Sequence, residues 1–62
     1  MDGLKYEVCR LRDVGGAEVY TTIVWTDVRT YAWDCANALT FLHGGTYVVL
    51  VDGKVVYRAD VV

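Results

Sequence analysis

The 62-residue sequence contains no proline, one histidine and two cysteines. Without proline or a linker-like stretch it offers no domain boundary, so residues 1–62 are predicted to form a single domain. Cys9 and Cys35 are too few for the disulfide framework of a small secreted protein. His43 has no cysteine or carboxylate at the spacing of a zinc ligand. We therefore expect no metal site and no bound cofactor.

Long apolar runs and clustered basic residues are also missing. No run approaches the ~20 residues of a membrane span, and no charged start leads into the short apolar segment of a signal peptide. We therefore expect a cytoplasmic protein with no membrane partner. The formal net charge is −2, whereas nucleic-acid-binding domains usually carry a clustered basic face. No nucleic-acid partner is expected.

Catalytic motifs are absent as well. The pairs Gly15-Gly16 and Gly44-Gly45 do not precede a helix, as the glycines of a phosphate-binding loop would. No set of polar residues has the spacing of a catalytic site. The sequence therefore favours a non-enzymatic protein, with a small enzyme or a cofactor-binding subunit as an alternative.

One segment, residues 26–44, is long and periodic enough for a helix. Apolar residues at alternating four- and three-residue spacing predict a buried stripe made of Val28, Ala32, Cys35, Leu39 and Leu42. Thr26 or Asp27 is expected to cap the N-terminus, and Gly44 to end the helix.

The segments on either side of this helix alternate like strands, at residues 4–12, 17–25, 46–51 and 54–59. Asp52-Gly53 predicts a type I′ hairpin turn. The fold class is therefore α+β, with ββαββ order and a four-stranded, largely antiparallel sheet carrying the helix on one face. The order of the strands stays open: the two hairpins can join through strands one and four or in another way.

A regular register across Asp52-Gly53 places Val49 opposite Val56, and Tyr47 opposite Arg58. The uncharged face of each hairpin is then expected to meet the helix. The residues assigned to the helix side are Leu4, Tyr6, Val8, Val19, Ile23, Trp25, Val48, Leu50, Val55, Tyr57 and Ala59. Cys9 faces away from the helix and Cys35 faces the sheet, so no disulfide is predicted.

Two apolar surfaces remain that a monomer does not need. The first is the back of the helix, where Trp33, Asn37 and Phe41 repeat at four-residue spacing beside Thr30 and Asp34. The second is the outer face of the sheet, whose candidate contact residues are Tyr20, Tyr47, Val49 and Val56. Rows of exposed aromatic residues are typical of contact sites. We therefore predict a protein-interaction module that binds a protein partner through one or both surfaces.

Both surfaces are also consistent with a purely structural role. The rings of the helix back can fold onto neighbouring segments, and valines favour strands even when exposed. Two outer sheet faces can also stack, which would give a small homodimeric structural protein.

The ββαββ order resembles that of the β-grasp-like immunoglobulin-binding domains of bacterial surface proteins. The chain, with its Asp-Gly hairpin at residues 45–57, is also similar to compact proteins of phages and mobile elements, including some anti-CRISPR proteins. That second resemblance implies an inhibitor that binds a larger host complex. Neither resemblance assigns a role to an individual residue.

Overall fold

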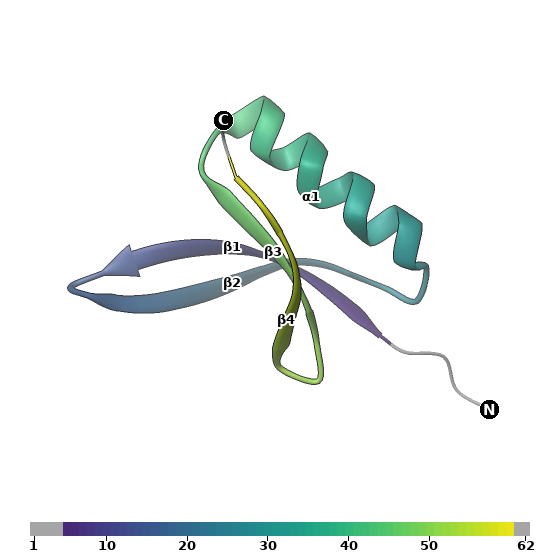
Figure 1. Cartoon of the computed structure of the whole chain (residues 1–62), viewed down its shortest axis with the longest axis horizontal. Helices are drawn as coiled ribbons and strands as arrows, with labels where there is room; N and C mark the ends of the chain where they lie inside the picture. The colour runs from purple at the N-terminus through teal and green to yellow at the C-terminus, as the bar shows by residue number, and fades with distance from the viewer. Residues whose placement is uncertain (1–4, 61–62) are drawn as a thin grey trace.

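The computed structural model describes residues 5–60, which form four strands and one helix in the order ββαββ (Figure 1). The elements are β1 Tyr6–Val14, β2 Ala17–Thr26, α1 Arg29–His43, β3 Thr46–Val51 and β4 Lys54–Ala59. The predicted α+β class and the antiparallel sheet with a helix on one face are confirmed.

The sheet has the order β2-β1-β3-β4, and every neighbouring pair is antiparallel. The two hairpins therefore join through β1 and β3. In a β-grasp they would join through the first and fourth strands, so the order differs from the first resemblance. β3 is apolar at every position after Thr46, and a central strand can bury side chains on both faces.

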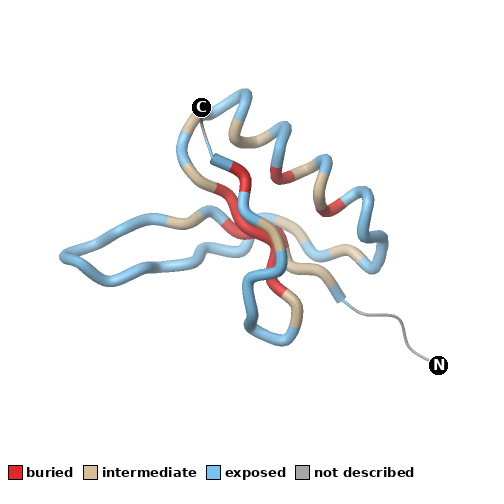
Figure 2. The backbone as a smooth tube through the Cα atoms, viewed as in Figure 1, coloured by how far each residue is buried: buried red, intermediate tan, exposed pale blue. Residues whose placement is uncertain are grey.

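The helix crosses one face of the sheet, while the outer part of the β1–β2 hairpin extends beyond it (Figure 1). Buried residues gather along β3 and the adjoining part of β1, and the hairpin tip is exposed (Figure 2). The core is therefore short and lies where β1, β3 and β4 pass under the helix.

Between the helix and the sheet lies the larger of two apolar clusters. Its buried members are Val8, Ala32, Ala36, Tyr47, Val49 and Ala59. The two helix residues in this set are alanines with no exposed surface. Because alanine has a short side chain, the helix axis can approach the strands closely, and larger side chains such as Leu39 pack at the sides of this contact.

A second, smaller cluster lies on the opposite face of the sheet. It contains Cys9, Val48 and Leu50, with Leu11 packed against them. Cys9 faces away from the helix as predicted, but it is fully buried. Neither Cys9 nor Cys35 is in a disulfide, and the sheet separates Cys9 from the cluster that Cys35 contacts.

A β-bulge in β4 makes part of the predicted face assignment wrong. Leu50 pairs with Val55 and Val49 with Tyr57, so Val56 is an extra residue in the ladder. Tyr57 therefore lies on the same face as Val49, and that face meets the helix. Tyr47 and Val49 are buried under the helix, whereas Val48 and Leu50 belong to the opposite face.

β2 has a similar irregularity. Val8 pairs with Val24 and Cys9 with Thr22, so Ile23 has no partner of its own in the ladder. Val24 packs against the helix-side cluster. Trp25 pairs with Glu7 and so lies on the outer face, contrary to the prediction. The assignments of Ile23 and Val55 to the core are also wrong, because both side chains are exposed, and Leu4 lies outside the described residues.

The helix is also rotated relative to the predicted stripe. Ala32 and Leu39 meet the sheet as expected, but Val28 and Leu42 are 50% and 69% exposed. The N-cap residue is Val28, which has no capping side chain; the Thr26 hydroxyl instead accepts a hydrogen bond from the Val28 N–H. Gly44 follows the helix at φ 72° as predicted, and its N–H donates to the Thr40 carbonyl.

The finding that Val49, and not Val48 or Leu50, faces the helix can be tested with two valine truncations. Val49→Ala should lower the free energy of unfolding by about 2–3 kcal/mol, because it removes two buried carbons and leaves a cavity. Val55→Ala, at an exposed site, should change it by less than about 1 kcal/mol. Urea unfolding followed by circular dichroism measures both. Equal losses in the two variants would contradict the observed register.

Candidate protein-interaction surfaces

Trp33 does not lie on a solvated helix back. Its ring stacks on that of Tyr57 with the centroids 5.0 Å apart, and it meets Tyr6 edge-on at 5.9 Å. Such aromatic pairs contribute more than their buried area alone. Trp33 therefore joins the helix to β4 and to the start of β1, and only part of the side chain remains accessible.

Asn37 also faces β4. Its side-chain oxygen accepts a hydrogen bond of 2.8 Å from the Tyr57 hydroxyl. One turn further on, the Thr40 hydroxyl donates to the main-chain oxygen of Ala59 at 3.1 Å. This side of the helix is thus joined to the edge strand β4 by polar contacts.

The other predicted members of the helix surface remain outside. Thr30 and Asp34 are exposed, and Phe41 is 87% exposed, the most exposed large hydrophobic residue described. The structure therefore separates the predicted row: Trp33 and Asn37 contact β4, whereas Phe41 points away from the core.

The predicted outer face of the sheet is also divided. Tyr47 and Val49 are buried beneath the helix, so they form no part of an accessible outer surface. Val56 is exposed, but it lines a hollow on the helix side. Tyr20 alone of these four lies where it was predicted, because it pairs with Leu11 on the face opposite the helix and is exposed.

An apolar surface that the sequence did not identify runs along one side of the helix. We call it the helix flank and define it as Val28, Tyr31, Cys35 and Leu42. These residues recur at spacings of three, four and seven and so share one side of the helix. Val28, Tyr31 and Leu42 are each at least half exposed. The spacing of these four residues is visible in the sequence. The predicted buried stripe nevertheless includes Val28, Cys35 and Leu42 and leaves Tyr31 out.

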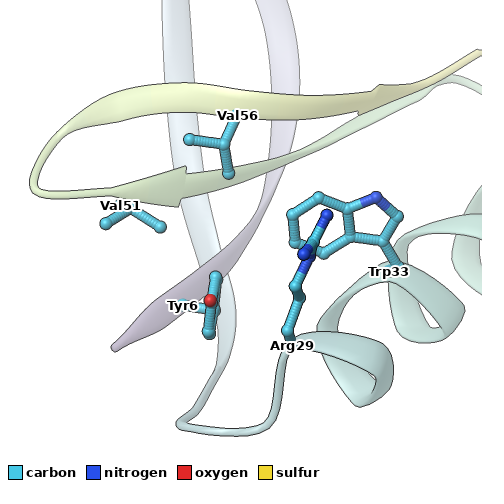
Figure 3. Close-up of a pocket in the computed structure, with 5 residues that line it drawn as sticks. All are labelled: Tyr6, Arg29, Trp33, Val51 and Val56. Atoms are coloured by element: carbon cyan, nitrogen blue, oxygen red, sulfur yellow. The ribbon is translucent and has the colours of Figure 1, made fainter. Parts of the chain in front are cut away.

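A hollow lies between the first turn of the helix, the start of β1 and the β3–β4 hairpin (Figure 3). We call it the notch; its lining residues are Tyr6, Arg29, Trp33, Val51 and Val56, and its volume is about 260 Å³. The Arg29 guanidinium carbon lies 5.0 Å from the centroid of the Trp33 ring, a cation–π distance.

On the face of the sheet that does not meet the helix, the side chains of Thr22, Glu7 and Cys9 form a hydrogen-bonded chain. The Thr22 hydroxyl donates to a carboxylate oxygen of Glu7, and the Cys9 sulfur lies 3.8 Å from the same hydroxyl oxygen. The pKa of the Cys9 thiol is raised to about 11, chiefly by burial; the Thr22 hydrogen bond opposes this rise and the Glu7 carboxylate adds to it. The thiol is therefore protonated near neutral pH and suits a structural role better than a nucleophilic one.

Within residues 5–60, no group of three or more histidine, cysteine or acidic side chains could hold a metal ion. The one helix in that range is too short and too polar to cross a membrane. Comparison with protein-family models, curated proteins and solved structures found no match to this chain.

The protection of Cys9 can be measured in a Cys35→Ser variant, which leaves one thiol. Because the pKa rises from 9.0 to about 11, the thiolate fraction at pH 8 should fall roughly a hundredfold on folding. Iodoacetamide should therefore label Cys9 at least about a hundredfold more slowly in the folded protein than in protein unfolded by urea. Similar rates in the two states would show that Cys9 is not buried. A Cys9→Ser variant provides the comparison for Cys35.

Proposed function

We propose that this chain is a non-enzymatic module that binds another protein through the helix flank and the neighbouring Phe41. The observation that carries the proposal is the amount of exposed apolar surface. Among the described residues, eleven large hydrophobic side chains are exposed, compared with nine buried hydrophobic residues. Single exposed apolar residues are ordinary in a folded protein, but contiguous ones tend to mark contact sites.

The helix flank is the part of this surface best suited to a partner. It is carried by a helix of 15 residues that is fixed to the sheet along its other side, so it is presented without rearrangement. Tyr31 supplies an aromatic ring of a type enriched at energetic hot spots. Phe41 lies outside the flank but precedes Leu42 in the helix and adds a second exposed ring. A partner that covers the flank would also bury apolar area that the small core leaves in water.

Binding by surface contact alone requires no catalytic group. It is also the way in which small inhibitors of phages and mobile elements act. An inhibitor that occupies a surface of a larger complex is therefore compatible with the proposal, and the helix flank would be its contact face.

The proposal predicts the behaviour of a charged double variant, Tyr31→Glu with Leu42→Glu. In a pull-down from cells of the natural source, a protein captured by the parent chain should be lost with this variant, because two carboxylates would have to be desolvated at the contact. Circular dichroism should show that the variant is folded, since both side chains are largely exposed.

The matched control is Val14→Glu, at an exposed residue at the end of β1 near the hairpin tip. It should capture the same protein as the parent chain. Equal capture by the helix variant would exclude the helix flank as the contact face. If the parent chain captures no protein that withstands washing, the binding proposal itself is wrong.

The second candidate function is self-association through the outer sheet face. It is favoured by three exposed residues on that face, Tyr20, Trp25 and Val55. β2 is moreover an edge strand of ten residues with no charge between Glu18 and Asp27, and unprotected edges can pair with another chain.

Sedimentation equilibrium distinguishes the two candidates. The interaction module should be a monomer at about 10 µM, because a weak face-to-face contact without a dedicated interface stays dissociated at that concentration. A dimer that Trp25→Lys converts to a monomer, and that the helix variant leaves intact, would establish the sheet-face association in its place.

A further inference from the structure

The notch offers a feature that the helix flank does not, namely an apolar hollow with a positive charge at its edge. Tyr6 and Trp33 give it aromatic walls, and Val51 and Val56 close the side formed by the β3–β4 hairpin (Figure 3). Arg29 reaches over the Trp33 ring at its mouth. Such a combination of apolar walls with a convergent polar group is typical of binding pockets.

The size of the notch limits what it can hold. Pockets for drug-sized ligands and cofactors are usually about 300–1,000 Å³, and this one is about 260 Å³. The notch would enclose only part of a nucleotide or a larger cofactor. One apolar side chain, or a small organic molecule of the same size, would fit.

The charge at the notch points to a negatively charged neighbour for that side chain. Residues 5–60 contain one ion pair, between Arg58 and Asp60, so Arg29 has no carboxylate within salt-bridge distance in that range. Arg29 is the cation in the lining of the notch. Acidic residues follow three of the lining residues in sequence, at Glu7, Asp34 and Asp52, but none forms an ion pair with Arg29.

We propose that the notch receives an apolar or aromatic side chain of a protein partner that has a carboxylate next to it. The ring or alkyl group would lie against Trp33, Tyr6 and the two valines, and the carboxylate would accept hydrogen bonds from the Arg29 guanidinium. The inference rests on the proposed protein-binding function and adds to it an anchor site separate from the helix flank.

The test uses peptide probes and does not require the natural partner. The first probe is an acetylated and amidated tetrapeptide in which a phenylalanine is followed by an aspartate, flanked by serines. The second has asparagine in place of the aspartate. Binding is read from the fluorescence of Trp33 in a Trp25→Phe background, since Trp25 lies on the opposite face.

The acidic peptide should bind with a dissociation constant of about 1 mM, as expected for one small side chain. The asparagine peptide should bind about fivefold more weakly, because the exposed ion pair contributes modestly. Arg29→Gln should remove this difference between the peptides. Arg12→Gln, at an exposed site on the far part of the β1–β2 hairpin, is the matched control and should preserve it.

A second variant tests the cavity itself. Val56→Asp places a carboxylate on the wall of the notch and should abolish binding of the acidic peptide, and circular dichroism checks that the fold is kept. Equal binding of the two peptides by the parent chain, or binding that survives Val56→Asp, would overturn the proposal.

A different occupant would give a different result. If phenylacetate binds at least as tightly as the acidic peptide, the site takes free small acids and the assignment to a protein side chain is wrong. Nuclear Overhauser contacts between the Trp33 ring and the methyl groups of Leu4 would show that the chain fills its own notch, which also overturns the proposal. The Tyr31→Glu, Leu42→Glu variant should still bind the acidic peptide. Peptide binding at the notch can then be judged independently of partner binding at the helix flank.

Discussion

The packing of two alanines of the helix against the central strands is the contact on which the rest of the structure depends. Ala32 and Ala36 have no exposed surface, and Val49 of β3 belongs to the same cluster. A larger residue at either alanine would push the helix away from the sheet. The contact sets the rotation of the helix, and this rotation brings Trp33 towards Tyr57 and leaves Leu42 in water.

Much of the architecture follows from local sequence signals. The Asp52-Gly53 turn adopts positive φ at both residues, Gly44 ends the helix, and the limits of β3 and β4 match the predicted ones. These features depend on one or two residues each, so local chemistry determines them. The side of the sheet that the helix covers depends instead on the whole ladder, and there the prediction is wrong in β3 and in parts of β2 and β4.

The two bulges explain that error. A strand without irregularities alternates faces strictly, so one extra residue reverses every assignment beyond it. Nothing in the valines at positions 55 and 56 distinguishes a bulged strand from a regular one. The predicted helix phase is wrong for a related reason: the helix carries two adjoining apolar sides, and alanine is a weaker hydrophobic signal than the valine and leucines beside it. The residues that decide the fit are the smallest in the segment.

The same rotation explains why the candidate surfaces differ from the predicted ones. The helix flank contains residues that composition favours for a core, and the notch contains Trp33, an aromatic residue that the predicted phase places on the solvated back. Which apolar side chains of the helix are exposed therefore depends on which of its two apolar sides packs against the sheet. The side it leaves uncovered is the one that the proposed partner would contact.

The projection of the β1–β2 hairpin beyond the helix has a consequence for how this chain can vary in length. Its tip at Gly15 and Gly16 touches neither apolar cluster, so residues added there disturb no packing. Because faces alternate along each strand, a lengthening that adds one residue to both strands keeps every existing pair opposite its partner. Insertions and deletions at the tip are thus tolerated in pairs, whereas a single residue gained or lost near Val56 would move side chains between the two faces.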